Sequence, residues 1–142
     1  MASRRKSREL ALQMLFQWEV GRHTPGKVVA NFLPTHKADD EVKNFARHLF
    51  EGTVADIDSI DPLIGRHAEN WKLERMAAVD RNVLRLAIYE MLHEPETPKA
   101  VVINEALELA RRFSTPDAVE FANGVLDAVR KSLALPAGGE KP

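Results

Sequence analysis

The sequence predicts an all-α fold, a compact bundle of six or seven helices within a single domain. Apolar residues recur every three or four positions through most of the chain, which is the spacing of an amphipathic helix. No segment shows the strict apolar–polar alternation of a half-buried strand, and the run from Ala100 to Ile103 is the one β-like stretch. A chain of 142 residues, 44% hydrophobic and 29% charged, is typical of one soluble globular domain.

The first expected helix begins near the N-terminus, and Gly21 and the turn-forming cluster at 24–26 end it. Its buried side carries one apolar stripe at helical spacing, formed by Leu10, Ala11, Met14, Leu15 and Trp18. A short helix follows over 28–33 and is closed by Pro34.

Two more helices are expected before the middle of the chain. Asp39 or Asp40 can cap a longer helix that runs past Gly52, and another short helix follows over 62–67. The acidic segment 56–61 lacks the turn glycine and the final glutamate of a calcium loop, so we interpret it as a solvated helix end.

Three helices are expected in the second half. The helix over 73–92 is apolar on nearly all sides, which predicts a central helix surrounded by neighbours. Thr97 and Pro98 indicate the capping residue and first residue of the next helix, and the pair at 115–116 repeats this signal. Inside the last helix, Gly124 costs about 1 kcal/mol relative to alanine, so we expect another backbone to approach it closely.

The sequence offers no candidate catalytic residue, metal site or cofactor site. The absence of cysteine excludes disulfides, thiolate zinc sites and cysteine nucleophiles. The five histidines have no partner at helical ligand spacing, and neither a phosphate-binding loop nor a nucleophile elbow is present. Glu105 and Glu108 lie at the spacing of an acid–base pair, but such residues are more often surface charges paired with Arg111 or Arg112.

The distribution of charge and apolar residues predicts a cytoplasmic protein. No window approaches the ~20 apolar residues of a membrane span, and the basic start does not lead into the apolar core of a signal peptide. The net charge is only −1, yet four cations fall within the first eight residues before any acid. This asymmetry favours an anionic partner for the N-terminus.

The first helix also carries a candidate surface for single-stranded RNA. At ~100° per residue, Phe16 points about 150° away from the apolar stripe, with Arg5 and Leu12 on its side and other cations flanking them. Cations neutralise phosphates, and an exposed aromatic ring stacks on an unpaired base. In the alternative interpretation the basic residues are merely solvated, and Leu12 and Phe16 pack under a neighbouring helix.

Four blocks resemble the NusB family of bacterial antitermination factors in order and spacing. Residues 4–9 read RRKSRE and residues 83–90 read VLRLAIYE. Residues 103–110 read INEALELA and residues 121–127 read FANGVLD. The chain also has the length of the family, so the resemblance covers essentially all of it.

The resemblance implies two small helical sub-bundles, about 1–70 and 71–135, followed by a tail over 136–142. It implies a non-enzymatic factor that binds boxA-type RNA of nascent ribosomal transcripts together with NusE, a small-subunit ribosomal protein. Other antitermination factors and, indirectly, RNA polymerase are further implied partners, and in this family a homodimer can cover the RNA surface. The alternative is a helical interaction or dimerisation domain with little RNA affinity.

The resemblance also assigns roles to particular residues. The arginine-rich start of the family falls on Arg4, Arg5, Lys6 and Arg8. Gln13 and Phe16 extend this RNA surface, Asp117 and Phe121 add a C-terminal contribution, and Asp80 matches an acid at the NusE interface. If four phosphates are neutralised, the logarithm of affinity should fall with that of salt at a slope of about −2.8 on single strands.

Three positions depart from the family pattern. Phe16 stands where a tyrosine is typical, which keeps stacking but loses a hydroxyl group. Glu120 replaces a lysine that contributes to the RNA surface, and Asp80 is shorter than the expected glutamate. We therefore expect RNA binding by the chain alone to be weak, with NusE supplying the rest. We also expect Arg5 and Arg8 to lie off the buried stripe, so that replacing both with alanine should lower RNA affinity and leave the fold intact.

Overall fold

The computed structural model describes residues 3–68 and 72–134, and all regular structure in these two ranges is helical. The α-helices are α1 (Arg4–Gly21), α2 (Pro25–Phe32), α3 (Asp40–Ala55), α4 (Ile57–His67), α5 (Ala78–His93), α6 (Lys99–Phe113) and α7 (Pro116–Leu133). Two short 3₁₀ helices cover Leu33–Thr35 and Leu73–Arg75. The predicted all-α class is confirmed. The expected division near residue 70 and the tail 136–142 lie outside the described residues.

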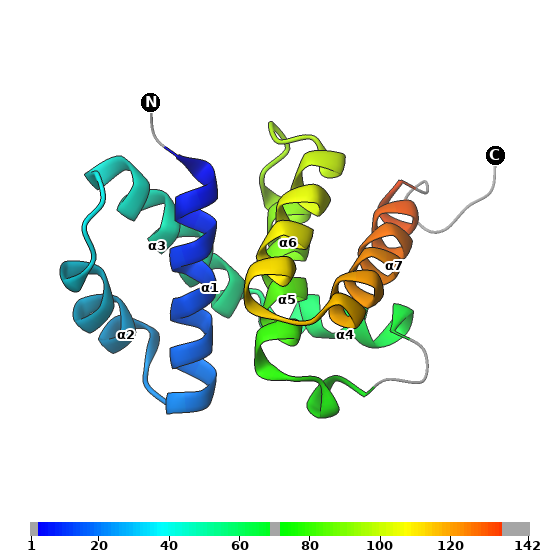
Figure 1. The fold of residues 1–142 in the computed structure, drawn as a ribbon, viewed down its shortest axis with the longest axis horizontal. Helices are drawn as coiled ribbons and strands as arrows, with labels where there is room; N and C mark the ends of the chain where they lie inside the picture. Colours follow the sequence, from blue (N-terminus) through cyan, green and yellow to red (C-terminus); the bar gives the residue numbers. More distant parts are fainter. Residues whose placement is uncertain (1–2, 69–71, 135–142) are drawn as a thin grey trace.

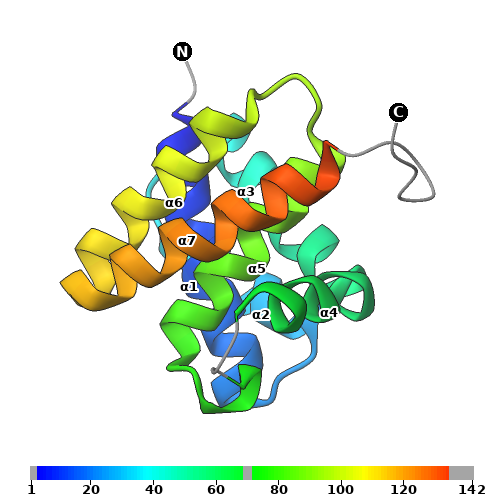
Figure 2. The same cartoon turned by 90° about the vertical axis from the view of Figure 1, so that its right-hand side faces the viewer.

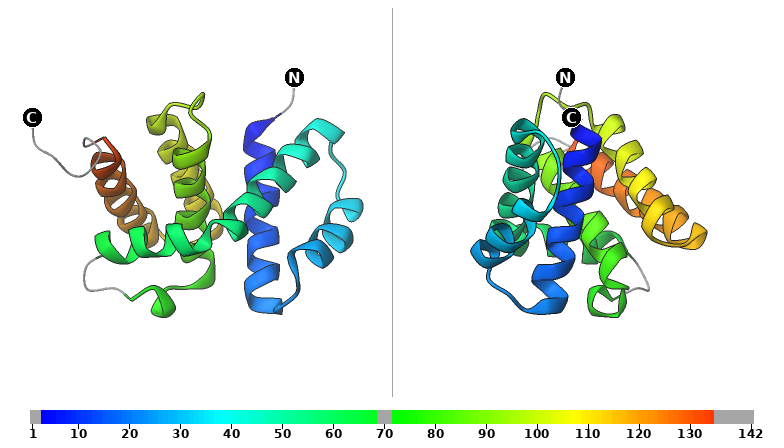
Figure 3. Two further views of the ribbon diagram at one scale, coloured as in Figure 1. Left: turned by 180° about the vertical axis from the view of Figure 1, so that it is seen from behind. Right: turned by 60° about the vertical axis from the view of Figure 1, so that its left-hand side comes forward.

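The helices form two groups joined by a central helix. Helices α1, α2 and α3 lie on one side of the molecule, and α5, α6 and α7 lie on the other (Figure 1). Helix α4 continues from the end of α3 and crosses the lower part of α5 toward α7 (Figure 3, left). Helix α5 packs against α1, α3, α4, α6 and α7, and α7 crosses over it (Figure 2). The predicted central helix is therefore confirmed.

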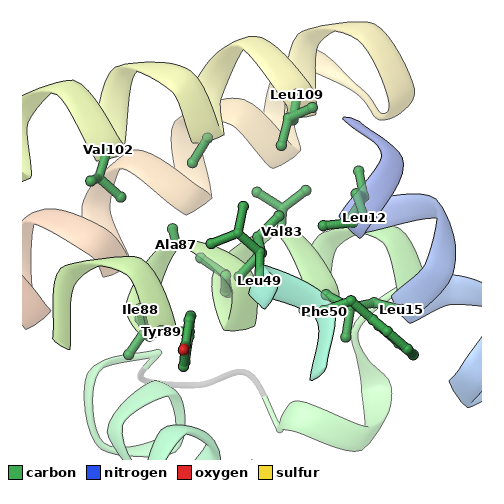
Figure 4. Close-up of a cluster of buried hydrophobic side chains, with 14 of the residues drawn as sticks. Leu12, Leu15, Leu49, Phe50, Val83, Ala87, Ile88, Tyr89, Val102 and Leu109 are labelled. Atoms are coloured by element: carbon green, nitrogen blue, oxygen red, sulfur yellow. The ribbon is translucent and has the colours of Figure 1, made fainter. Parts of the chain in front are cut away.

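The core is continuous between the two groups. Side chains from α1, α3, α5 and α6 meet in one cluster, which includes Leu12, Leu49, Val83 and Leu109 (Figure 4). Every residue from Asn82 to Met91 in α5 is buried, which explains why this helix is apolar on nearly all sides. No described helix is both long enough and apolar enough to cross a membrane.

Capping residues explain where several helices begin. The Thr24 hydroxyl accepts a hydrogen bond from the Lys27 N–H at 3.3 Å, so the 24–26 cluster opens α2 rather than only ending α1. The Thr115 hydroxyl accepts from the Ala118 N–H at 3.1 Å, which confirms the predicted start of α7. For α6 the capping position is Pro98, one residue later than predicted.

Two predicted helix starts in the middle of the chain are wrong. Helix α4 begins at Ile57, five residues earlier than expected, and contains Pro62. Burial of Ile60 and Ile64 on either side offsets the hydrogen bond that this proline cannot donate. Helix α5 begins at Ala78, because the preceding residues form a 3₁₀ turn and then extended backbone.

The expectation for Gly124 is also wrong, since a Cβ atom there would meet nothing within 4 Å. The close approach occurs at Gly52 in α3 instead. A Cβ atom at Gly52 would lie 2.2 Å from the hydroxyl oxygen of Tyr89, so the buried tyrosine of α5 requires glycine at this position.

Candidate nucleic-acid interface

Two arginines at the start of α1 are held by glutamates of α5 and α6. Arg5 donates from Nε and Nη2 to both carboxylate oxygens of Glu105, at 3.0 and 2.8 Å. Arg8 donates in the same two-pronged way to Glu90, with 2.9 Å between Nε and Oε1. Nη1 of Arg8 also lies 3.8 Å from Glu105, so the four residues form one cluster.

The two arginines differ in burial. The Arg8 side chain is 7% exposed and Glu90 is 1% exposed, whereas Arg5 is 61% exposed over a Glu105 that is 17% exposed. The expectation that Arg8 lies off the buried side is therefore wrong. The side of α1 that carries Arg8 and Leu12 is covered by α5.

The pKa values of this cluster follow from the same contacts. Burial on its own would lower the pKa of Arg8, but the hydrogen bonds and charge of Glu90 raise it above the ordinary value. The hydrogen bonds with Glu105 raise the pKa of Arg5, and those from Arg5 lower the pKa of Glu105. Arg5, Arg8 and Glu105 are therefore charged at neutral pH.

The two remaining N-terminal cations also have partners on the protein. The Arg4 guanidinium stacks 3.6 Å from the ring centre of Phe45 in α3, a cation–π contact. The Lys6 ammonium lies 3.8 Å from a carboxylate oxygen of Glu9, and Glu9 also pairs with Arg112 of α6. The sequence placed Arg112 among ordinary surface charges and gave no sign that it faces α1.

These contacts define a seam between α1 and α6, made of Arg5, Lys6, Glu9, Glu105 and Arg112. Helix α6 runs beside α1 in the same direction, over α5 (Figure 1). The acids of the seam are largely covered, Glu9 at 10% exposed, while its cations are open, Arg112 at 57%. The seam therefore presents cationic groups to solvent, which is the arrangement that binds phosphates.

A groove with exposed aromatic rings lies farther along α1, which we call the Phe16 groove. Its volume is about 470 Å³, and it is lined by Leu12, Gln13, Phe16, Gln17, Phe32, His36, Val79 and Phe113. Phe16 is 39% exposed and Phe113 is 37% exposed, whereas Leu12 is buried at 3%. Phe113 was missed because its spacing in α6 assigns it to the core stripe. Exposed phenyl rings can stack on unpaired bases.

The other predicted residues line a second hollow, the Asp80 groove, of about 170 Å³. It contains Asp80, Asp117 and Phe121, with Arg75, Met76, Ala77, Thr115 and Ala118. Asp80 accepts a hydrogen bond from the Ser114 hydroxyl, which joins the start of α5 to the link between α6 and α7. Because Val79 lines the Phe16 groove, the two grooves are neighbours.

A second cluster of charged residues lies at the other end of α1 and joins three helices. Glu19 accepts from Arg81 and Arg85, each at 3.0 Å, and Arg85 also donates to both oxygens of Asp61 in α4. Burial on its own would raise the pKa of Glu19, but the hydrogen bonds and charges of the two arginines lower it. This cluster fastens α1 and α4 to α5.

Two kinds of chemical site considered from the sequence can be tested on the described residues, a metal site and the acid–base pair of Glu105 and Glu108. Within residues 3–68 and 72–134, no group of three or more histidine or acidic side chains could hold a metal ion. Glu105 and Glu108 do not form an acid–base pair, because Glu105 is held by Arg5 and Glu108 by Arg111 at 2.9 Å.

Comparison with known sequences gives a consistent result. The sequence model of the NusB family matches residues 5–131. A transcription antitermination protein NusB from Koribacter versatilis is 54% identical over 132 residues, which cover 92% of this chain and 90% of the relative. A protein of the same name from Solibacter usitatus is 47% identical over 138 residues, covering 96% and 94%.

Solved structures show the same fold. A structure of T. maritima NusB matches with a TM-score of 0.84 and 40% identity, covering 92% of this chain and 93% of that one. A chain from a complex described as antitermination factors NusB and NusE with double-stranded RNA matches with a TM-score of 0.83 and 25% identity. This match covers 91% of the present chain and 96% of the other.

Proposed function

Because the chain belongs to the NusB family of non-enzymatic, RNA-binding transcription antitermination factors, we propose that it binds boxA-type single-stranded RNA of nascent ribosomal transcripts together with NusE. The observation that carries the proposal is the α1–α6 seam, in which the arginine side chains are exposed to solvent while the glutamates that bind them are largely buried. The seam leads to a groove with two exposed phenyl rings.

Each part of this surface suits one part of an RNA strand. Arg4, Arg5, Lys6 and Arg112 are exposed cations that can meet backbone phosphates. The rings of Phe16 and Phe113 can stack on bases splayed from the strand, and Gln13 adds a hydrogen-bonding amide in the same groove. Arg8 is buried beneath this surface and supports it, because Nε and Nη2 of its guanidinium donate to Glu90.

We assign the NusE contact to Asp80 and the C-terminal part of the RNA surface to Asp117 and Phe121, which line the same groove. Asp80 is fixed by Ser114 at the junction of three helices, and Asp117 and Phe121 lie in the same hollow. A partner seated there would lie beside the Phe16 groove, so it would extend the RNA surface. One chain that resembles this protein comes from a complex of NusB and NusE with double-stranded RNA. This supports the proposal that one surface region serves both NusE and RNA. Other antitermination factors and RNA polymerase would join this assembly indirectly.

The test is fluorescence anisotropy of a labelled boxA-type RNA, with and without NusE, over a range of salt concentrations. Arg112 takes the place of Arg8 among four phosphate-binding cations, so the expected salt slope remains about −2.8 for a single strand. NusE should tighten binding. Binding that is absent, or independent of salt and of NusE, would refute the proposal.

A second candidate function is a protein-interaction or dimerisation domain with little RNA affinity. It is favoured by the acidic partners of Arg5, Lys6 and Arg112, which reduce the net charge of the seam, and by Glu120 on the exposed side of α7. Analytical ultracentrifugation combined with the RNA titration separates the two. A stable homodimer that does not bind RNA even at low salt would favour this candidate.

A further inference from the structure

The carboxylate of Glu105 holds Arg5 in the way that a phosphate group would. Both of its oxygens accept from the guanidinium, at 3.0 and 2.8 Å, and arginine binds carboxylate and phosphate in this same two-pronged geometry. An RNA phosphate that reaches this edge of Arg5 must therefore compete with Glu105.

The Glu105 side chain is held in place by its surroundings, whereas the Arg5 side chain is free to move. Glu105 is 17% exposed and is also attracted by Arg8 from below, at 3.8 Å. Arg5 is 61% exposed and projects from the first turn of α1, so its side chain is free to turn toward another partner. Exchange of Glu105 for a phosphate then requires movement of Arg5 alone.

The net charge of the cluster formed by Arg5, Arg8, Glu90 and Glu105 is zero, because its two arginines balance its two glutamates. Phosphate binding to single strands is driven by cationic charge that displaces counterions. Because Glu105 neutralises Arg5, this part of the seam attracts any strand more weakly, whatever its base sequence.

From these observations, and on the premise that the seam binds RNA as proposed above, we propose that Glu105 is an internal competitor of RNA phosphates. By neutralising Arg5 it lowers the affinity for single-stranded RNA regardless of sequence. Recognition of the correct RNA then depends more strongly on base stacking in the Phe16 groove and on the partner protein.

The decisive variant is Glu105→Gln, because the amide oxygen still accepts a hydrogen bond from Arg5 while the negative charge is removed. We expect RNA binding to become about threefold tighter, the size of an exposed ion pair, and equally so for a boxA-type RNA and a scrambled strand. The matched control is Glu108→Gln, the same charge change one turn along α6, where the partner is the exposed Arg111. Its smaller effect measures the general influence of net charge.

A double-mutant cycle shows whether Glu105 acts through Arg5. In an Arg5→Gln background, Glu105→Gln should change RNA affinity no more than Glu108→Gln does. Circular dichroism and urea unfolding of each variant establish that the helices remain folded. Weaker binding by Glu105→Gln, or the same tightening in the Arg5→Gln background, would overturn the proposal.

The same titrations separate failure of this inference from failure of the proposed function. Wild-type protein that shows no salt-dependent RNA binding refutes the function itself. Wild-type protein that binds RNA, with Glu105→Gln no tighter than Glu108→Gln, leaves the function intact and refutes only the role of Glu105.

Discussion

The two ends of α1 carry clusters of arginine and carboxylate groups that differ in the burial of their cations. At the C-terminal end, the arginines that bind Glu19 are 12% and 7% exposed. At the N-terminal end, the arginine that binds Glu105 is 61% exposed. The hydrogen bonds are of one kind, but water and salt weaken an exposed pair while a buried pair cannot be opened without stranding a charge. Burial therefore separates structural arginines from those available to a ligand.

The boundary between these two behaviours falls within a single helical turn. Arg5 and Arg8 are three residues apart on α1, and each is bound by both oxygens of a glutamate. Only Arg8 resembles the arginines of the C-terminal cluster in its burial. Substitution of a buried arginine should accordingly lower stability most, whereas substitution of the exposed Arg5 should mainly change RNA binding.

The largest expected effect is the loss of stability in Arg8→Ala. Removing this guanidinium leaves the Glu90 carboxylate buried without a counter-charge, which should lower the free energy of unfolding by about 3–5 kcal/mol. Urea denaturation followed by circular dichroism measures the change. As a control, Arg8→Met combined with Glu90→Leu removes both charges and should recover most of the loss. If Arg8→Ala on its own were as stable as wild type, Arg8 would not be a structural arginine.

Arg85→Ala should be the next most destabilising substitution. It removes the hydrogen bonds to Asp61, Glu19 and Asn82, which fasten α4 and α1 to α5. The two acids are about one quarter exposed and regain water, so we expect a loss of about 2–3 kcal/mol, less than for Arg8→Ala. Arg111→Ala, in an exposed pair with Glu108, is the control and should leave the urea midpoint unchanged. Equal losses in Arg85→Ala and Arg111→Ala would contradict the distinction drawn from burial.

A smaller effect is expected on acidification. The folded state lowers the pKa of Glu19 and of Glu105 below the unfolded value of about 4.3, so both stabilise the fold above that pH. This contribution is lost as the pH falls through the lower pKa of the folded state. The urea midpoint should fall less steeply from pH 7 to pH 3 in Glu19→Gln than in wild type. Glu105→Gln should change this pH dependence less than Glu19→Gln does. The reverse order would show that the pair of Glu105 with the exposed Arg5 matters more for folding than the pairs of Glu19 with the buried Arg81 and Arg85.

Helical spacing was sufficient to predict the fold class and the central helix, and the Thr115–Pro116 capping signal predicted the start of α7. It could not predict that Pro62 lies inside α4, because the penalty for an internal proline is local, whereas burial of Ile60 and Ile64 depends on neighbouring helices. For the same reason the sequence predicts at Gly124 a close approach that the structure has at Gly52. The position of Tyr89, 37 residues farther along the chain, decides which glycine is needed.

The candidate site was predictable in its residue types and less so in their orientation. The apolar stripe predicts a single buried side of α1 and leaves Leu12 and Arg8 outside it. In the structure α3 and α5 both cover the helix, so the side that carries these two residues is buried as well. The partners Glu90 and Glu105 lie 82 and 100 residues away, and no spacing rule within a helix connects them to α1.

The smallest effect on stability, and the clearest effect on RNA, is expected from Arg5→Gln. Its guanidinium is open to solvent and Glu105 can regain water when it is lost, so the urea midpoint should match wild type. If Arg5 exchanges Glu105 for a phosphate, the variant should bind boxA-type RNA more weakly, with a salt slope less negative by about 0.7. Arg111→Ala again serves as the control and should keep the wild-type slope. A variant that loses stability but keeps the wild-type slope would place Arg5 with Arg8 among the structural arginines, and the difference in burial between them would then have no functional meaning.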